Sequence, residues 1–395
     1  MDDHTPAPEP INAPPGNSPP PPVTPPPIIP PWPPGPPRGR SGAVWKVLAV
    51  VFLILLVLSL FTNFLNFSHT IIPRSHASAE RDHGLEEVVV EHTNSDNKIA
   101  VIEVDGVISS EEIERSGMNL VDFIGEQLKM AGHDSDVKAV ILKVNSPGGE
   151  VLASDEINQA ITRFQEQTRK PVVVSMDSLA ASGGYYISVP CRWIVANELT
   201  ITGSIGVIMH DYNYRLLMDK VGIQPHVFKS GRFKDMLSGE QEPDVSKLSE
   251  EDRRNRDQED AMVQALIDET FGKFKEVVKT GREHAASLND GKGKTLVDDW
   301  QDYADGRVLS GKQALAFGFV DELGDFETAV NRAENIVGIP SANIVEYRIQ
   351  FDLGSVLAHI FGKSEVPAIK VDLGMDLPKL EAGRLYFIAP MTVLH

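Results

Sequence analysis

The chain has 395 residues and a formal net charge of −19, from 37 basic and 56 acidic side chains. Nucleic-acid binding is driven by neutralising phosphates, so a chain this acidic, with no basic stripe, is not expected to bind nucleic acid. The single cysteine, Cys191, excludes an internal disulfide, and the length exceeds that of one ordinary domain.

Residues 1–42 are predicted to form a disordered, proline-rich tail. The first 40 residues hold 18 of the 28 prolines in the chain. Proline fixes φ and has no backbone N–H, so this composition excludes regular helix or sheet. We interpret the tail as an extended spacer, with a ligand for a proline-reading domain as the open alternative.

A single transmembrane helix is predicted over residues 43–67. No Asp, Glu, Lys or Arg occurs between Lys46 and Arg74, and residues 47–67 are mostly Val, Leu, Ile and Phe. A helix of about 20 such residues spans a hydrocarbon core of roughly 30 Å. Basic residues before the span keep the N-terminus in the cytoplasm, so the rest of the chain is expected outside, on the periplasmic side. Cleavage near Ala79 is the alternative, but that position lies far beyond the apolar run.

Residues 68–97 form an expected extracytoplasmic linker with one strand, at 86–92, and a regular α/β pattern follows. Strands alternating with helices predict parallel β-α-β units with both faces of the sheet buried. The domain with this pattern is predicted over 98–340, and residues 341–395 form an extension of unknown role. The expected strands are 98–104, 139–145, 171–176, 193–196 and 225–228, and the expected helices are 118–130, 156–167, 248–282 and one within 305–324.

Paired glycines follow one of these strands. The sequence SPGG at 146–149 comes directly after the strand at 139–145. Two glycines at the carboxyl end of a parallel strand remove Cβ atoms from the rim where ligands bind. They would let a substrate carbonyl approach bare N–H groups, as in an oxyanion hole. On its own the motif also fits a tight Pro-Gly turn.

Ser182 lies in the sequence ASGGYY at 181–186, after the strand at 171–176. A hydroxyl between Ala and Gly is sterically open, and at a helix start it would lie at the positive end of the helix dipole. Both features suit a nucleophile, although a serine N-cap with packing glycines is the alternative. Lys234, in GRFKD at 231–235, reads alone as a solvated surface charge.

Four motifs in order carry a family resemblance: SPGG (146–149), ASGGYY (181–186), TGSIGV (202–207) and GRFKD (231–235). Together they resemble the signal peptide peptidase A family of serine peptidases, in the Clp/crotonase superfamily. The resemblance covers residues 98–337 and includes a close match at 305–324. It implies an α/β fold, a Clp/crotonase-like β-β-α superhelix, here preceded by the transmembrane helix and the proline-rich tail.

The resemblance also implies roles for individual residues. Ser182 would be the nucleophile and Lys234 its general base, while Ser204 would hold the lysine amine by a hydrogen bond. The N–H groups of Gly149 and Ser182 would bind the oxyanion. A lysine acts as a base only when neutral, a form that burial beside Phe233 would favour.

The implied protein is a membrane-anchored endopeptidase that hydrolyses remnant signal peptides and other membrane-associated peptides. In the family, the serine and lysine of one site come from different copies of the domain, so this chain is expected to work as a homo-oligomer. No cofactor and no metal are expected.

Other interpretations stay open on the sequence alone. His210 or His226 could serve a Ser-His-Asp triad, although neither lies in a matching motif. Cys191 lacks a glycine-flanked opening and is expected in the core. A membrane scaffold without activity is the main functional alternative, and an acyl-CoA enzyme would need Glu150 as its acid/base group.

Overall fold

The computed structural model of the chain describes residues 85–111, 118–349 and 384–389, together with positions 46, 48, 51–56 and 59. The strands are β1 (Leu85–Glu91), β2 (Lys98–Asp105), β3 (Val137–Ser146), β4 (Gly148–Glu150), β5 (Val172–Ala181), β6 (Trp193–Ala196), β7 (Ile201–Gly203), β8 (Ile208–Met209), β9 (Val308–Ser310), β10 (Glu322–Leu323), β11 (Asn343–Ile349) and β12 (Leu385–Ile388). The helices are α2 (Leu120–His133), α3 (Val151–Thr168), α4 (Gly183–Ser188), α5 (Arg215–Val221), α6 (Glu250–Leu288), α7 (Gly311–Phe317) and α8 (Phe326–Val337), with short 3-10 turns at η1 (Val245–Lys247) and η2 (Trp300–Tyr303).

The predicted parallel α/β core is confirmed. The main sheet runs in the order β1-β11-β2-β3-β5-β6-β10, with β7 and β9 joined at the end of β5. The strands β2, β3, β5 and β6 are mutually parallel. The fold is therefore a mixed α/β fold in which the carboxyl ends of the central strands meet along one edge, the edge where such sheets bind ligands.

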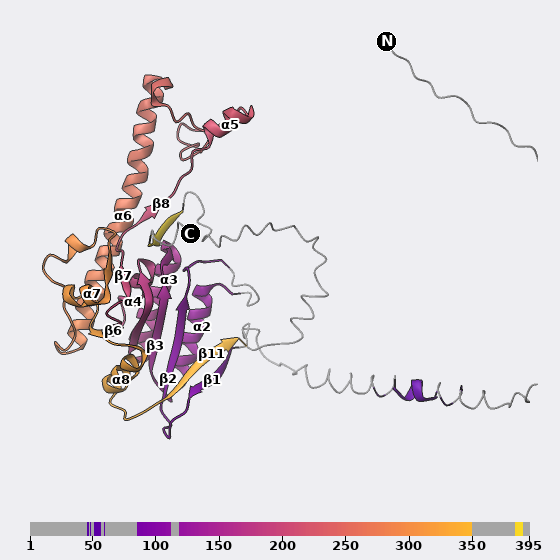
Figure 1. Ribbon diagram of the computed structural model, residues 1–395, viewed down its shortest axis with the longest axis vertical. Helices are drawn as coiled ribbons and strands as arrows, with labels where there is room; N and C mark the ends of the chain where they lie inside the picture. The colour runs from indigo at the N-terminus through magenta and orange to yellow at the C-terminus, as the bar shows by residue number, and fades with distance from the viewer. Residues whose placement is uncertain are drawn as a thin grey trace, which may run out of the picture. The chain divides into compact units, whose positions relative to one another are not determined.

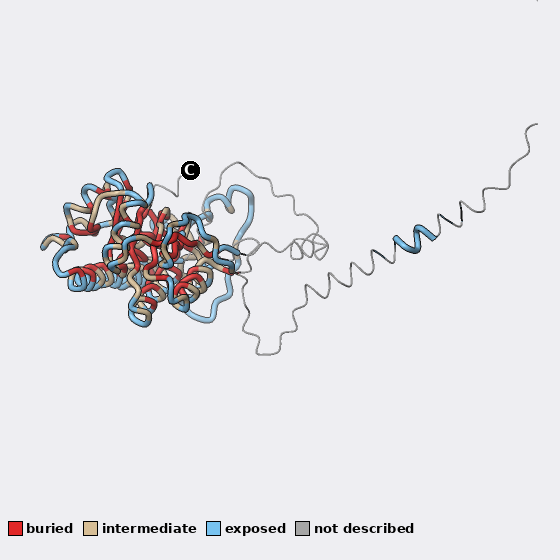
Figure 2. Tube along the Cα trace, turned by 90° about the horizontal axis from the view of Figure 1, so that it is seen from below, coloured by how far each residue is buried: buried red, intermediate tan, exposed pale blue. Residues whose placement is uncertain are grey.

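Helices cover both faces of this sheet (Figure 1). Alternate residues of β2 point to opposite sides: Ile102 packs in a cluster with Ile124 of α2 and Ile157 of α3, whereas Ile99 packs with Ala333 of α8. Both faces of the sheet are consequently buried, which explains why the sequences of the central strands are continuous apolar runs. Figure 2 shows the buried residues, in red, gathered in the interior of the unit Glu80–His395.

The helix α6 is unusually long and divides into two halves. Its C-terminal half packs on the body through Phe274 and Val278, and Arg282 makes a buried ion pair with Asp321 at 2.6 Å. Its N-terminal half leaves the body and carries a loop-rich segment (Figure 1). We call this segment, residues 210–249, the arm; it includes α5 and η1.

The structure corrects several expected boundaries. The helix expected at 156–167 begins earlier, at Val151, because Ala153 is buried and the Ser154 hydroxyl donates to the Glu150 carbonyl. The strand expected at 225–228 is absent from the arm as described, where Phe228 is 87% exposed and pairs with no neighbouring strand. A strand needs a partner for its backbone groups, and the arm offers none there.

The main sheet extends beyond the domain expected at 98–340. The strand β1 falls in the expected linker, and β11 falls in the expected C-terminal extension. Both pair with each other, and β11 also pairs in parallel with β2. Hydrogen bonding between segments far apart in the sequence therefore adds two strands to the edge of the core.

Most of the predicted tail (1–42) and transmembrane helix (43–67) lies outside the described residues. Positions 46, 48, 51–56 and 59 are helical. In the part of the chain that the structure describes, no helix has both the length and the apolar composition needed to cross a bilayer. The possible cleavage site near Ala79 also lies outside the described residues.

Candidate active site

Ser182 occupies a sharp turn between β5 and α4, with φ of 53° and ψ of −113°. Positive φ strains a residue that has a Cβ, and such strain clusters at functional positions, including nucleophiles between a strand and a helix. The residue is 0% exposed, and its Oγ has no hydrogen-bond partner among the described residues. A buried hydroxyl without a partner is costly, so this geometry indicates a group held for chemistry.

The two glycine motifs lie against each other at this turn. A Cβ atom added to Gly183 would lie 3.0 Å from the Gly149 nitrogen, and one added to Gly184 would lie 2.8 Å from the Ser146 carbonyl oxygen. Real Cβ atoms need more space than this, so side chains at these positions would push the two loops apart. The structure therefore brings Gly149 next to Ser182, as the sequence predicts.

Ser204 joins the site through β7. Ala181 lies opposite Gly203 in the register of β5 and β7, and Ser204 follows directly with a φ of 49° and 3% exposure. The Ser204 N–H donates to the Arg307 carbonyl at 2.8 Å. Of the predicted residues, Gly149, Ser182 and Ser204 are thus collected around one turn.

The Ser182 N–H has a different role from the predicted one. The sequence predicts it as an oxyanion donor, whereas in the structure it donates to the Gly203 carbonyl at 2.8 Å. This bond closes the turn onto β7. The next N–H, that of Gly183, is the first of α4, and first-turn N–H groups have no partner within their own helix. The sequence interpretation did not single out the Gly183 N–H, although this glycine is part of the ASGGYY motif.

Lys234 is not part of this cluster within one chain. It is exposed on the arm, and the Oγ of Ser182 has no partner in the part of the chain that is described. The neighbouring Arg232 donates to Gln258 in the N-terminal half of α6 at 3.1 Å. Further along α6, the Phe274 ring lies beside that of Tyr186 in α4. At a rise of about 1.5 Å per residue, the helix is about 24 Å long between Gln258 and Phe274.

The alternative catalytic groups are disfavoured by their surroundings. Cys191 is fully buried, and desolvation raises the pKa of its thiol well above the usual range, which suppresses the reactive thiolate. On the arm, the His210 ring stacks on that of Tyr212, and the His226 ring meets that of Phe228 edge-on. Neither histidine donates to or accepts from the Ser182 hydroxyl, which is without a partner across the described ranges.

Glu150 is committed to other contacts. Its carboxylate accepts from the Ser110 hydroxyl at 2.5 Å and from the Arg384 guanidinium at 2.5 Å. Burial acts to raise the pKa of this carboxyl, but the hydrogen bonds from Ser110 and the Arg384 charge outweigh it and lower the pKa. A carboxylate tied in this way is a poor acid/base group, which disfavours the acyl-CoA enzyme. Within the described ranges, no group of three or more His, Cys, Asp or Glu side chains could hold a metal ion.

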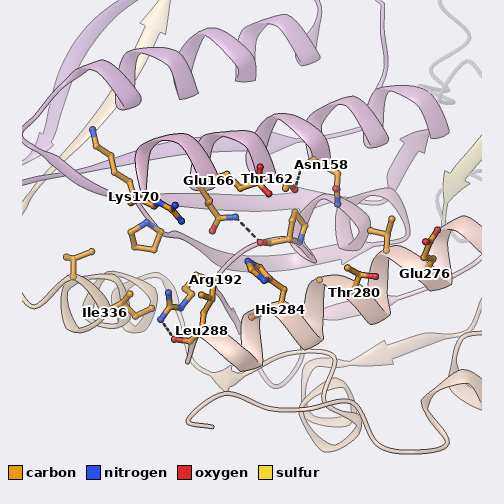
Figure 3. Close-up of a pocket in the computed structure, with 18 of the residues that line it drawn as sticks. Asn158, Thr162, Glu166, Lys170, Arg192, Glu276, Thr280, His284, Leu288 and Ile336 are labelled. Atoms are coloured by element: carbon orange, nitrogen blue, oxygen red, sulfur yellow. Dashed lines mark hydrogen bonds between the residues drawn. The ribbon is translucent and has the colours of Figure 1, made fainter. Parts of the chain in front are cut away.

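A cavity of about 920 Å³ lies elsewhere, between α3 and α6 (Figure 3). Thr162 on α3 and His284 on α6 are among the residues that line it. None of the predicted site residues contributes to the lining. The glycine-flanked turn around Ser182 is instead covered by the strand β12, which pairs with β4.

Comparisons with known proteins identify the family of this chain. The family model described as Peptidase family S49 matches residues 164–339. A Synechocystis protein named as a protease, slr0021, is 33% identical over 72% of this chain and 90% of its own length. An Enterococcus faecium protein named as a signal peptide peptidase, SppA, is 34% identical over 67% of this chain and 71% of its own length.

A longer relative and a solved structure also match. Protease 4 of Haemophilus influenzae is 37% identical over 63% of this chain, which spans only 36% of that relative. A solved structure of the 1510-N membrane-bound stomatin-specific protease aligns with a TM-score of 0.35 and 15% identity, over 67% of this chain and 97% of that one. The curated relatives and the family match together establish that the chain belongs to peptidase family S49, the family of the SppA serine peptidases.

Proposed function

We propose that this chain is a serine endopeptidase in which Ser182 is the nucleophile, Lys234 the general base and Ser204 the residue that holds the lysine amine. The observation that carries the proposal is the strained and buried Ser182 at the carboxyl end of β5, whose Oγ has no hydrogen-bond partner among the residues that the structure describes. Membership of a serine peptidase family supports the same assignment. The finer fold assignment, a Clp/crotonase-like superhelix over 98–340, belongs to this proposal.

The oxyanion hole of the proposed enzyme consists of the N–H groups of Gly149 and Gly183. Gly183 replaces Ser182 in this role because the Ser182 N–H is already bonded to Gly203. The nitrogen of Gly149 lies 3.0 Å from the Cβ position of Gly183, so both donors can face one oxygen. Two fixed donors aimed at a developing negative charge stabilise the transition state without reorganisation.

The reaction follows from these positions. Neutral Lys234 accepts the Ser182 proton as Oγ attacks the substrate carbonyl carbon. The C–N bond of the tetrahedral intermediate then breaks, and the leaving amine takes the proton from the lysine. Water, deprotonated by the same lysine, hydrolyses the acyl-enzyme and returns a proton to the Ser182 oxygen.

In the proposed enzyme, a second copy of the chain supplies the lysine. In one chain, the arm contacts α6 at Gln258, and α4 contacts it at Phe274. These two positions are about 24 Å apart along the helix. The arm also exposes apolar side chains that a monomer would leave in water, among them Tyr212 (63%), Leu217 (62%) and Phe228 (87%). Exposed apolar groups on a projecting segment are typical of an interface between subunits. The proposed active form is a homo-oligomer with shared sites.

The proposed enzyme is anchored by residues 43–67, with its catalytic domain on the periplasmic side of the membrane. Its proposed substrates are remnant signal peptides and other membrane-associated peptides. The apolar, uncharged run at 47–67 supports the anchor. Apolar peptides that stay near the bilayer would meet an anchored enzyme at raised local concentration.

Peptidase assays of the full chain in detergent test the proposal. Ser182→Ala and Lys234→Ala should each lower kcat by at least about a thousandfold on an apolar peptide with a fluorogenic leaving group. Ser178→Ala and Lys220→Ala are matched controls, since both side chains are exposed and outside the cluster, and both should leave kcat unchanged. Activity that survives both active-site substitutions would exclude the dyad, and an inactive wild-type oligomer would favour a binding role.

A further inference from the structure

The strand β7 connects the turn of Ser182 to a second turn that the proposed mechanism does not use. It lies between β5 and β9, so that Gly203 has Ala181 opposite it on one side and Val308 on the other. The three residues before β9 form this second turn, which we call the DGR turn: Asp305, Gly306 and Arg307. The end of β7 is thus held between the strand of the proposed nucleophile and the strand that follows the DGR turn.

Two backbone hydrogen bonds join the DGR turn to the residues that follow β7. The Ser204 N–H donates to the Arg307 carbonyl at 2.8 Å, and the Gly306 N–H donates to the Ile205 carbonyl at 2.9 Å. Ser204 has a φ of 49°, and a strained conformation of this kind persists only where the surrounding structure fixes it. The two bonds supply such a restraint on both sides of the Ser204 carbonyl group.

Glycines allow the two segments to approach this closely. A Cβ atom added to Gly206 would lie only 3.1 Å from the Gly306 Cα. Gly306 itself has a φ of +90°, which a residue with a side chain rarely adopts. A Cβ atom added to Gly306 would nevertheless meet no atom of the described residues within 4 Å. A substitution at Gly306 would therefore strain the backbone of the turn without creating a steric clash.

The side chains of Asp305 and Arg307 close the turn. The Asp305 carboxylate accepts from the Arg307 backbone N–H at 3.1 Å, from its Nε at 2.7 Å and from its Nη2 at 2.6 Å. The hydrogen bonds from the Arg307 side chain lower the pKa of Asp305 to about 2, so the carboxylate stays ionised near neutral pH. Both side chains are 49% exposed, so the pair adds little to global stability and acts mainly on local geometry.

We propose that the DGR turn is a positioning element of the active site, which fixes the backbone of Ser204 so that its hydroxyl can hold the amine of Lys234 from a second copy. Asp305, Gly306 and Arg307 act through Ser204 in this proposal. The inference rests on the proposed function and adds the structural support of one of its residues.

A labelling experiment tests the support without depending on peptidase activity. Ser204 is 3% exposed, so the thiol introduced by Ser204→Cys should react slowly with a soluble maleimide. Adding Gly306→Ala should raise this rate at least about fivefold, because the strained turn opens more often. Gly338→Ala is the matched control, since Gly338 also has a positive φ (71°) and open space around its Cβ position. It should leave the rate unchanged.

The native cysteine reports on the rest of the fold in the same sample. Cys191 is fully buried, and burial raises the pKa of its thiol well above the usual range, so it should stay unlabelled in the folded chain. Equal rates with and without Gly306→Ala would overturn the proposal. Labelling of Cys191 together with the introduced thiol would overturn it as well, because the turn would then support the whole fold and not Ser204 in particular.

Kinetics of the full chain in detergent test the effect on the reaction. Gly306→Ala should lower kcat at least about tenfold and leave KM within about twofold, because a displaced Ser204 affects the reacting groups and not substrate binding. Asp305→Ala should also lower kcat, and Asp305→Asn should restore most of the loss, since its side-chain oxygen can still accept from the Arg307 N–H. Unchanged kcat in Gly306→Ala, with Ser204→Ala impaired, would contradict the proposal.

A double-variant cycle shows whether the turn acts through Ser204. In the Ser204→Ala background, adding Gly306→Ala should lower kcat by less than about twofold further, whereas independent effects would multiply. Multiplied losses would overturn the positioning role. If Ser182→Ala and Lys234→Ala remain active, the proposed function fails, and the labelling rates still decide whether the DGR turn holds residue 204.

Discussion

The surroundings of Ser182 and of Lys234 differ in almost every physical respect. Ser182 lies at the carboxyl end of a central strand, 0% exposed, between two glycine loops in contact. Lys234 lies exposed on the arm, which follows β8 and precedes α6 in the chain. In the proposed enzyme, the fold of one chain therefore fixes the nucleophile, and a second copy of the chain positions the base. Placing the two groups on separate supports would make the proposed activity depend on assembly.

The largest effect is expected when two inactive variants are mixed, because peptidase activity should return. Ser182→Ala and Lys234→Ala subunits, denatured and reassembled together, should recover about a quarter of wild-type activity if each site takes its serine and lysine from different copies. The measurement is peptidase activity against each variant reassembled alone, which should stay at background. No recovery in mixed oligomers of confirmed composition would place both groups in one chain.

Removing the charge that anchors α6 should have the next largest effect. Asp321→Asn leaves the fully buried Arg282 without its carboxylate partner, and we expect a loss of about 3–5 kcal/mol in the free energy of unfolding. Asp305→Asn is the matched control, because Asp305 pairs with Arg307 at the same 2.6 Å but with both side chains 49% exposed. It should cost less than about 1 kcal/mol. Chemical denaturation of both variants measures the difference, and equal losses would contradict the anchoring role.

Adding one methyl group to each region gives the smallest effects. Gly183→Ala places a Cβ atom 2.7 Å from the Ser154 hydroxyl, and we expect a loss of about 1–3 kcal/mol in stability, together with lowered kcat. Gly231→Ala on the arm adds a Cβ atom that meets no atom within 4 Å, so stability should change by less than about 0.5 kcal/mol. Thermal unfolding measures the stability of both variants, and peptidase assays measure their kcat. A tolerated Gly183→Ala would show that the loops around Ser182 can move apart.

The sequence predicted the core well because the core uses local patterns. Strands buried on both faces read as apolar runs, so 98–104 and 193–196 correspond closely to β2 and β6. The glycines around Ser182 were visible as well, since their spacing reflects the contact of two loops. The beginning of α3 was missed because the helix starts directly after the short strand β4, at Val151, which packs against the core.

Features that depend on distant pairing could not be read from the sequence. The contact of Phe387 with Gly149 joins segments with no shared pattern, and β11 joins the main sheet from the expected extension. The engagement of the Ser182 N–H by Gly203 depends on how β7 turns back onto β5. The strand expected at 225–228 fails for the opposite reason, because its apolar residues face solvent on the arm.

The length of α6 has a consequence for which changes the chain can tolerate. The helix continues without interruption from Glu250 to Leu288, and only its C-terminal half is fixed to the body. Deleting a single residue from the exposed half would turn everything before it by about 100° and draw it in by about 1.5 Å. Point changes at the exposed positions of that half should therefore have little effect. A one-residue deletion there should instead turn GRFKD away from the proposed site that it serves in a second copy. Insertions and deletions in this half of α6 are then expected to be tolerated only when their length is close to a whole number of helical turns.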